Sequence, residues 1–253
     1  MQLKLTDKKV VMKLPTLEGI EDALEIVRLY LSETPLFHSA PISDALNAEV
    51  WIKIETLSPI ASFKLRGALV DISRALNLGS FARVVTSSTG NHGLGVAYAA
   101  LQFGLDAEIF LPLNANPVKA EMIRNLGASI HNSGQDVADT KAVAQQFAKE
   151  HGYHFVDDGN SIDLMEGAGT VGLEIANSLE TVDQIYVPLG DGALLGGTAC
   201  VFKSLKRSTR IIGVQSEGAP ALTNSFHARQ SLDHSVNTIA EGLASRKPSP
   251  LAL

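Results

Sequence analysis

Residues 62–68 read S-F-K-L-R-G-A and follow a short apolar run at residues 50–55, so the local pattern is strand, turn and helix. The apolar positions after this stretch share one helical face: Leu65, Leu69, Ile72 and Leu76. Lys64 stands at the N-terminal end of that helix, between two apolar neighbours. The helix dipole and apolar surroundings both lower the pKa of an amine, which favours a nucleophilic Lys64. The other interpretation is a solvated surface lysine.

Outward from this stretch, short runs rich in Val and Ile alternate with helical patterns. The candidate strands are residues 50–55, 83–87, 107–111, 128–132, 153–156, 184–188 and 210–215. This alternation predicts mostly parallel sheets with helices on their faces. The seven strands are compatible with one sheet or with two, and the periodicity leaves both open.

The composition excludes several classes of protein. The chain has 253 residues, 45% of them hydrophobic and 19% charged, and a formal net charge of −6. An acidic surface repels phosphate backbones, which argues against nucleic-acid binding. The sequence has neither an apolar run of membrane-spanning length nor a signal peptide, so we expect no membrane partner and a cytoplasmic location. Its single cysteine, Cys200, excludes an internal disulfide and a multi-cysteine metal site.

A second polar cluster, S-T-G-N-H-G at residues 88–93, directly follows the strand predicted at 83–87. Two hydroxyls, an amide and backbone N–H groups stand where a helix begins, which suits a carboxylate or a phosphate. An ordinary strand-to-helix turn, with Ser88 or Thr89 as N-cap, explains the same residues.

A third cluster, G-D-G-A-L-L-G-G at residues 190–197, follows the strand predicted at 184–188. Small residues let backbone amides approach an anion, and the following helix adds its dipole. The spacing is that of neither a P-loop nor a dinucleotide fingerprint. Asp191 argues against a phosphate if its side chain points inward, and a plain glycine-rich turn remains the alternative.

Taken together, the three clusters indicate one ligand site, because each follows a predicted strand and open parallel sheets bind ligands at the carboxyl ends of their strands. A nucleophilic lysine, a carboxylate cradle and a phosphate cradle are what a pyridoxal-phosphate enzyme acting on an amino acid requires.

In this order the three motifs resemble the fold-type-II pyridoxal-phosphate enzymes, and the branch they resemble most is that of the serine/threonine dehydratases and serine racemases. The resemblance runs from T-P-L at residues 34–36 to T-I-A-E-G-L at residues 238–243. It implies a tryptophan-synthase-β-like α/β fold with two open, mostly parallel sheets flanked by helices. It also implies a larger discontinuous domain, 1–79 and 158–253, and a smaller inserted domain, 80–157, with the site in the cleft between them.

The resemblance assigns residues to the cofactor, pyridoxal 5′-phosphate. Lys64 matches the lysine that holds it as a Schiff base, Phe63 matches the residue beside its ring, and Asn91 matches the side chain that bonds its 3-hydroxyl. The phosphate loop falls on Gly190, Asp191, Gly192, Ala193 and Leu194, and Gly242 lies in a motif whose backbone approaches the cofactor. Backbone groups that grip the substrate carboxylate fall on Ser88, Thr89, Asn91 and His92.

Three departures from the family pattern stand out. Asp191 and Ala193 replace two of the usual four glycines of the phosphate loop, and we expect Asp191 to point outward. Thr89 stands where serine racemases carry a proton-exchanging serine, so it is a second catalytic candidate beside Lys64. Family members usually continue for several dozen residues past this C-terminus, so we expect a C-terminal truncation. The metal site of some relatives does not transfer, and no metal is expected.

The resemblance implies a lyase that eliminates water from serine, threonine or 3-hydroxyaspartate and yields a 2-oxo acid and ammonia. The alternatives are an amino-acid racemase or β-replacement enzyme of the same fold, and a truncated, catalytically silent homologue that binds the cofactor. The expected partners are an amino-acid substrate and a second copy of the chain in a homodimer.

Overall fold

Within the residues that the computed structural model describes, 13–88, 90–135 and 137–253, the strands form three sheets. The first is an antiparallel pair, β1 (Leu36–His38) and β2 (Trp51–Lys53). The second has the order β5 (Ser129–Asn132), β4 (Asp106–Leu111), β3 (Arg83–Ser87) and β6 (His154–Phe155), all parallel. The third is the parallel pair β7 (Gln184–Pro188) and β8 (Arg210–Val214).

Helices flank these sheets. They are α1 (Leu17–Arg28), α2 (Ala40–Leu46), α3 (Lys64–Leu78), α4 (Asn91–Gln102), α5 (Pro117–Asn125), α6 (Val137–His151), α7 (Ile162–Ser178), α8 (Ala193–Ser204) and α9 (Ala221–Ala228). Short 3-10 turns occur at η1 (Glu55–Leu57), η2 (Glu241–Leu243) and η3 (Pro250–Ala252). No helix in these described ranges is long and apolar enough to cross a membrane.

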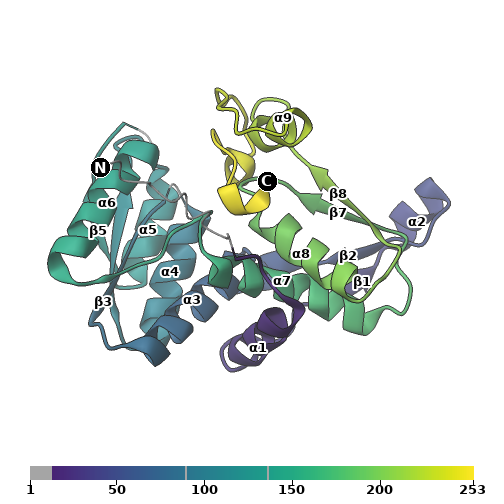
Figure 1. Ribbon diagram of the computed structural model, residues 1–253, viewed down its shortest axis with the longest axis horizontal. Helices are drawn as coiled ribbons and strands as arrows, with labels where there is room; N and C mark the ends of the chain where they lie inside the picture. The colour runs from purple at the N-terminus through teal and green to yellow at the C-terminus, as the bar shows by residue number, and fades with distance from the viewer. Residues whose placement is uncertain (1–12, 89, 136) are drawn as a thin grey trace, which may run out of the picture.

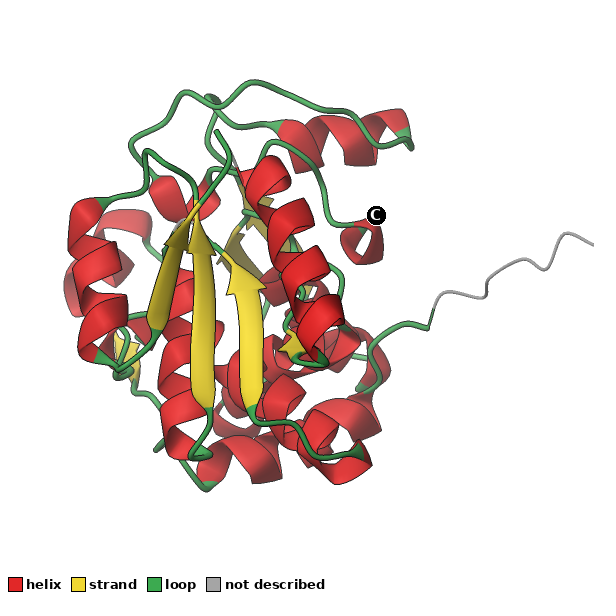
Figure 2. Cartoon of the chain, turned by 90° about the vertical axis from the view of Figure 1, so that its left-hand side faces the viewer, coloured by secondary structure: helices red, strands yellow, loops and turns green. Residues whose placement is uncertain are grey.

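The four-stranded sheet is covered on both faces, as Figure 2 shows. On one face, α3 and α4 pack buried side chains such as Leu69 and Val96 against Val84 and Ile109. On the other, α6 lies against β3 and β4. Because both faces are covered, every residue of β3 after Arg83 and of β4 after Asp106 is buried, polar residues such as Thr86 and Glu108 included. Because the strands are parallel, the residues that follow β3 and β6 emerge at the same edge of the sheet.

Helix α7 joins this sheet to the other half of the molecule, where α8 packs on β7 and β8 (Figure 1). Its glycines allow unusually close contact on two sides. A β-carbon built on Gly167 would lie 2.6 Å from the Cα of Gly67 in α3, and one on Gly197 in α8 would lie 2.6 Å from the Cα of Gly169. The helix that begins at Lys64 and the helix that follows the 190–197 loop are therefore held against one common helix.

The predicted strands are all observed, with ends that differ by at most two residues. The predicted α/β fold class with parallel sheets flanked by helices is confirmed, and two of the three sheets are parallel. The prediction lacked β1 and therefore the antiparallel pairing of the strand at 50–55. With three residues, β1 is too short to show a period, and its half-exposed Phe37 does not resemble a core strand.

Candidate active site

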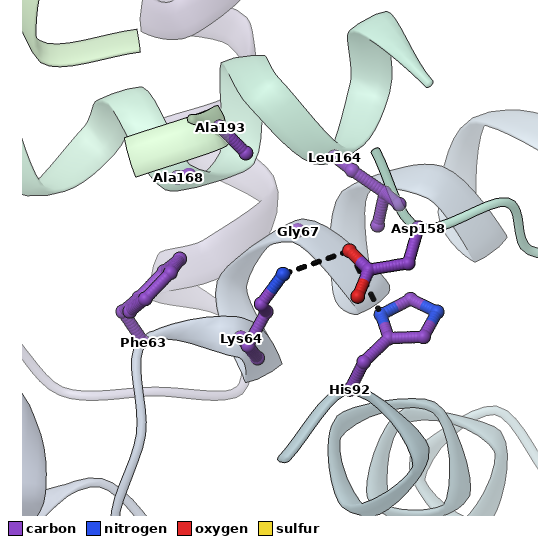
Figure 3. Close-up of a pocket in the computed structure, with 8 residues that line it drawn as sticks. All are labelled: Phe63, Lys64, Gly67, His92, Asp158, Leu164, Ala168 and Ala193. Carbon is purple, nitrogen blue, oxygen red and sulfur yellow. Dashed lines mark hydrogen bonds and ion pairs between the residues drawn. The ribbon is translucent and has the colours of Figure 1, made fainter. Parts of the chain in front are cut away.

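Lys64 is the first residue of α3, and its side chain is only 16% exposed. The amine is held between two carboxylates. Its Nζ lies 2.7 Å from Oδ1 of Asp158 and 2.6 Å from Oδ2 of Asp191. Figure 3 shows Asp158 between the Lys64 amine and the ring of His92. The lysine is therefore a buried, paired group, and the alternative of a solvated surface lysine is wrong.

The direction of the Lys64 pKa shift differs from the sequence-based expectation. Burial does lower the pKa of this amine, as expected, but the charges and hydrogen bonds of Asp158 and Asp191 outweigh burial and raise the pKa well above its usual range. The amine is therefore a stable ammonium in this arrangement. It becomes a nucleophile only when the carboxylates release it.

Asp191 points inward, against the expectation that it would point outward. One carboxylate oxygen pairs with Lys64, and the other, Oδ1, accepts a hydrogen bond of 3.0 Å from the backbone N–H of Ala193. The reason is electrostatic, because a carboxylate at this place meets both a buried cation and the positive N-terminal end of α8. Gly192, with φ of +101°, makes the turn into that helix.

Asp158 was missed as a site residue. It lies three residues after the end of β6 and two residues after the buried Val156, and so at the same sheet edge as the 88–93 loop. Burial by itself raises the pKa of Asp158, but the facing His92 and Lys64 hold the pKa well below its usual range. Its position after a predicted parallel strand was the signal that could have found it.

His92 is buried and uses only one of its ring nitrogens for a hydrogen bond. Its Nε2 lies 2.9 Å from Oγ1 of Thr86, and that hydroxyl donates its own proton to the carbonyl of Val156. A neutral ring therefore carries its proton on Nε2, and Nδ1 has no hydrogen-bond partner among the described residues. Nδ1 lies 3.7 Å from Oδ1 of Asp158, on the side that faces the cavity beside Lys64.

This geometry predicts the tautomer of His92. In the cofactor-free chain, the neutral ring should carry its proton on Nε2, which ¹⁵N chemical shifts of the labelled imidazole measure. His151 is the matched control, because its Nδ1 lies 2.8 Å from the carbonyl of Phe147 and must be the donor there. His92 should therefore show the opposite tautomer to His151, and a neutral His92 protonated on Nδ1 would contradict the assignment.

Ser88 and Asn91, two further residues predicted for the site, lie in the turn into α4 and at its start. Ser88 is buried, and its Oγ accepts hydrogen bonds from the backbone N–H of Gly90 at 3.0 Å and Gly93 at 2.9 Å, so its hydroxyl closes the turn into α4. Asn91 opens α4, and a β-carbon built on Gly242 would lie 3.8 Å from its Nδ2. Thr89 lies outside the described residues.

The 190–194 loop meets this region through Gly190, since a β-carbon there would lie 3.0 Å from the carbonyl oxygen of Gly242. Phe63 precedes α3, and its ring centroid lies 5.7 Å from the Lys64 Nζ. Ala193 begins α8, followed by Leu194, and both are buried. The described residues that the resemblance assigned to the cofactor are thus neighbours in space.

A cavity adjoins the amine. It is lined by Phe63, Lys64, Gly67, His92, Asp158, Leu164, Ala168 and Ala193 (Figure 3). Its volume is about 10 Å³, which is room for roughly one water molecule. The amine, the small residues in the wall and the unpartnered Nδ1 of His92 chemically suit a polar aromatic cofactor held at Lys64, and a cavity of this size admits its ring only after the lining side chains move apart. Asp191 fits a phosphate group only after its carboxylate turns away.

Comparison with known proteins gives a consistent result. The family of pyridoxal-phosphate dependent enzymes matches residues 27–253. The catabolic L-threonine dehydratase of Staphylococcus aureus (strain USA300) is 34% identical over 235 residues, which are 92% of this chain and 68% of the relative.

Solved structures are similar as well. A pyridoxal 5′-phosphate-dependent aspartate racemase superposes with a TM-score of 0.88 at 26% identity, over 96% of this chain and 76% of the other. Processed threonine deaminase isoform 2 from Solanum lycopersicum has a TM-score of 0.87 at 28% identity, over 99% and 72%.

Proposed function

This chain belongs to the pyridoxal-phosphate dependent enzymes, and from that premise we propose that it eliminates water from a β-hydroxy amino acid. The products are a 2-oxo acid and ammonia, and the substrate is serine, threonine or 3-hydroxyaspartate. The cofactor is pyridoxal 5′-phosphate. The observation that carries the proposal is the largely buried amine of Lys64, which is held between Asp158, beside the 88–93 loop, and Asp191 of the 190–197 loop.

We propose the following roles for the cofactor-binding residues. Lys64 holds the cofactor, Phe63 packs beside its ring, and Asn91 and Gly242 border it. The loop of residues 190–194 receives its phosphate. When bound, pyridoxal 5′-phosphate supplies an aldehyde for the amine and a ring that accepts the electrons released at the substrate Cα.

The proton transfer that we propose for the chain's own residues takes place at the Nζ of Lys64. The Lys64 Nζ, released from its carboxylates, takes the proton from the substrate Cα. The loop of residues 88–92 binds the substrate carboxylate through backbone N–H groups, which orients the Cα–H bond toward Lys64. The electron pair of the Cα–H bond then forms the Cα=Cβ double bond as the Cβ–O bond breaks, and the β-hydroxyl leaves as water with the proton that Lys64 Nζ has taken up. The catalytic role proposed for Thr89 rests on the sequence alone.

We also propose the domain division expected from the resemblance, with residues 80–157 as the smaller inserted domain. Its support is that one sheet takes all its strands from residues 83–155. The proposed site residues come from both parts, Lys64 and Asp191 from the larger and His92 from the smaller. Such a boundary between domains is a common place for a ligand.

Product analysis tests the proposal. The purified chain, loaded with pyridoxal 5′-phosphate, should release 2-oxo acid and ammonia in equal amounts from at least one of L-serine, L-threonine and 3-hydroxyaspartate. L-Alanine is the control, because it lacks the β-hydroxyl and should release neither product. Failure to release a 2-oxo acid from any of the three would overturn the dehydratase assignment.

A racemase is the second candidate, because a similar solved structure is an aspartate racemase. It predicts the D-enantiomer of an amino acid from the L-enantiomer, without ammonia. β-Replacement would instead give a new amino acid when a thiol is added. A catalytically silent cofactor-binding homologue is the third candidate, favoured by the inward position of Asp191, and it predicts cofactor absorbance without any product. The homodimer and the cytoplasmic location stay predictions, and sedimentation of the purified chain tests the first.

A further inference from the structure

Asp191 is the one charged residue in a loop that is otherwise small or apolar, G-D-G-A-L-L-G-G at residues 190–197. The backbone on either side of it is tightly packed. A β-carbon on Gly190 would lie 3.0 Å from the carbonyl oxygen of Gly242, and one on Gly192 would overlap the side chains of Leu222 and Ala252. The loop therefore has little freedom, and the Asp191 side chain is the part of it that projects toward Lys64.

The two oxygens of this carboxylate have separate partners. Oδ2 lies 2.6 Å from the Nζ of Lys64, and Oδ1 accepts a hydrogen bond from the Ala193 N–H, the first amide of α8. The first N–H groups of a helix have no partner within the helix and attract anions. A phosphate group held by this loop would use the same end of α8. Asp191 thus already provides an anion at the place where the phosphate is proposed to bind.

We infer that the Asp191 carboxylate competes with the phosphate group of the cofactor for the N-terminal end of α8. The preference of this chain for pyridoxal phosphate over phosphate-free pyridoxal is therefore smaller than it would be without Asp191. The inference rests on the cofactor site of the proposed function. It makes Asp191 a residue that determines cofactor specificity, through a contact that the phosphate must displace.

The charges around Lys64 support this competition. The amine brings one positive charge, which Asp158 and Asp191 already share at 2.7 and 2.6 Å. A phosphate next to an inward-facing Asp191 would meet a like charge, and the cation that contacts Asp191 among the described residues, the Lys64 amine, is already paired with two carboxylates. The carboxylate must turn away before the phosphate binds, which costs its hydrogen bond to Ala193 and its pairing with Lys64. Phosphate-free pyridoxal does not need the end of α8 and avoids the first of these losses.

The experiment compares two ligands that differ only in the phosphate. Dissociation constants of pyridoxal 5′-phosphate and pyridoxal are measured by absorbance titration of the cofactor-free chain and of Asp191→Gly. Release of Lys64 affects the aldehyde of both ligands equally, so the ratio of the two constants isolates the phosphate. We expect this ratio, pyridoxal over pyridoxal phosphate, to rise at least tenfold in Asp191→Gly.

Asp158→Asn is the matched control. It removes the other carboxylate from the same amine but leaves the contact at Ala193 intact. Both dissociation constants should change in parallel there, and their ratio should stay within twofold of the wild-type ratio. Asp191→Asn keeps a side-chain acceptor for the Ala193 N–H without the charge and should give an intermediate ratio. If Asp191→Gly shows no cooperative thermal unfolding and is therefore not folded, the comparison is made with Asp191→Asn instead.

An unchanged ratio in the Asp191 variants, or an equal rise in Asp158→Asn, would overturn the inference. The titrations contain no amino acid, so they remain informative even if the chain proves not to be a dehydratase. If the wild-type chain binds neither ligand, Asp191→Gly must gain binding of pyridoxal phosphate, and continued lack of binding also counts against the inference.

Discussion

Lys64→Ala is expected to lose the absorbance of the covalently held cofactor and to lower kcat/KM by about 10³-fold or more, the effect of losing a nucleophile and general base together. The amine is the one group of the described site that is placed both to bond an aldehyde and to move the substrate proton. Absorbance spectra of the purified variant with pyridoxal 5′-phosphate, and 2-oxo acid release from the best substrate, are the measurements.

Two further variants separate chemistry from structure. Lys64→Arg keeps a positive charge between Asp158 and Asp191, so it should fold like the wild type and yet be as inactive as Lys64→Ala. Lys203→Ala, which changes an exposed lysine near the end of α8, should keep both absorbance and turnover. Turnover retained in Lys64→Ala would dispose of the proposed mechanism.

Arg66→Ala is expected to reduce the free energy of unfolding by about 3–5 kcal/mol, the usual cost of removing one partner from a buried ion pair. The Arg66 side chain is fully buried. Its guanidinium donates to both carboxylate oxygens of Glu174, at 2.7 and 2.8 Å, and to both of Glu55, each at 2.9 Å. Without Arg66, Glu174 keeps only Lys53, at 2.6 Å, as a cationic partner among the described residues, and Glu55 is left partly buried.

Urea unfolding of the cofactor-free chain measures this loss. Arg28→Ala is the matched control, since Arg28 pairs with Glu25 on an exposed face of α1 and should contribute no more than about 1 kcal/mol. A loss below about 1 kcal/mol in Arg66→Ala would show that the buried network does not stabilise the fold. The network lies two residues from Lys64 on the same helix, so we expect weaker cofactor binding in any Arg66 variant that still folds.

The architecture was largely predictable because its signals are local. Short runs that contain Val and Ile alternate with segments of helical period, and this alternation predicts parallel strands joined by helices, as β3 and β4 are. The rule that ligands bind at the carboxyl ends of such strands then brought together the loops that begin at Ser88 and Gly190. Three-residue β1, which has no period, was not predictable in this way.

The charges at the site were predicted less well. The expectations that Lys64 would have a lowered pKa and that Asp191 would point outward were both wrong, and Asp158 was not considered. These features depend on pairs that are 94 and 127 residues apart in the chain. The helix dipole and the apolar neighbours of Lys64 can be identified from residues 62–68 alone. A carboxylate that belongs to another loop cannot be identified from that stretch.

The sequence by itself therefore determined the alternation of strands and helices, the three motifs at residues 62–68, 88–93 and 190–197, and the Lys64 amine as the reactive group among them. Only the tertiary structure decided the electrical state of that amine, since it alone brings Asp158 and Asp191 within hydrogen-bond distance of it. The physical reason is that backbone periodicity is a short-range property, whereas the balance between burial and charge on a buried group is set by every segment that packs around it.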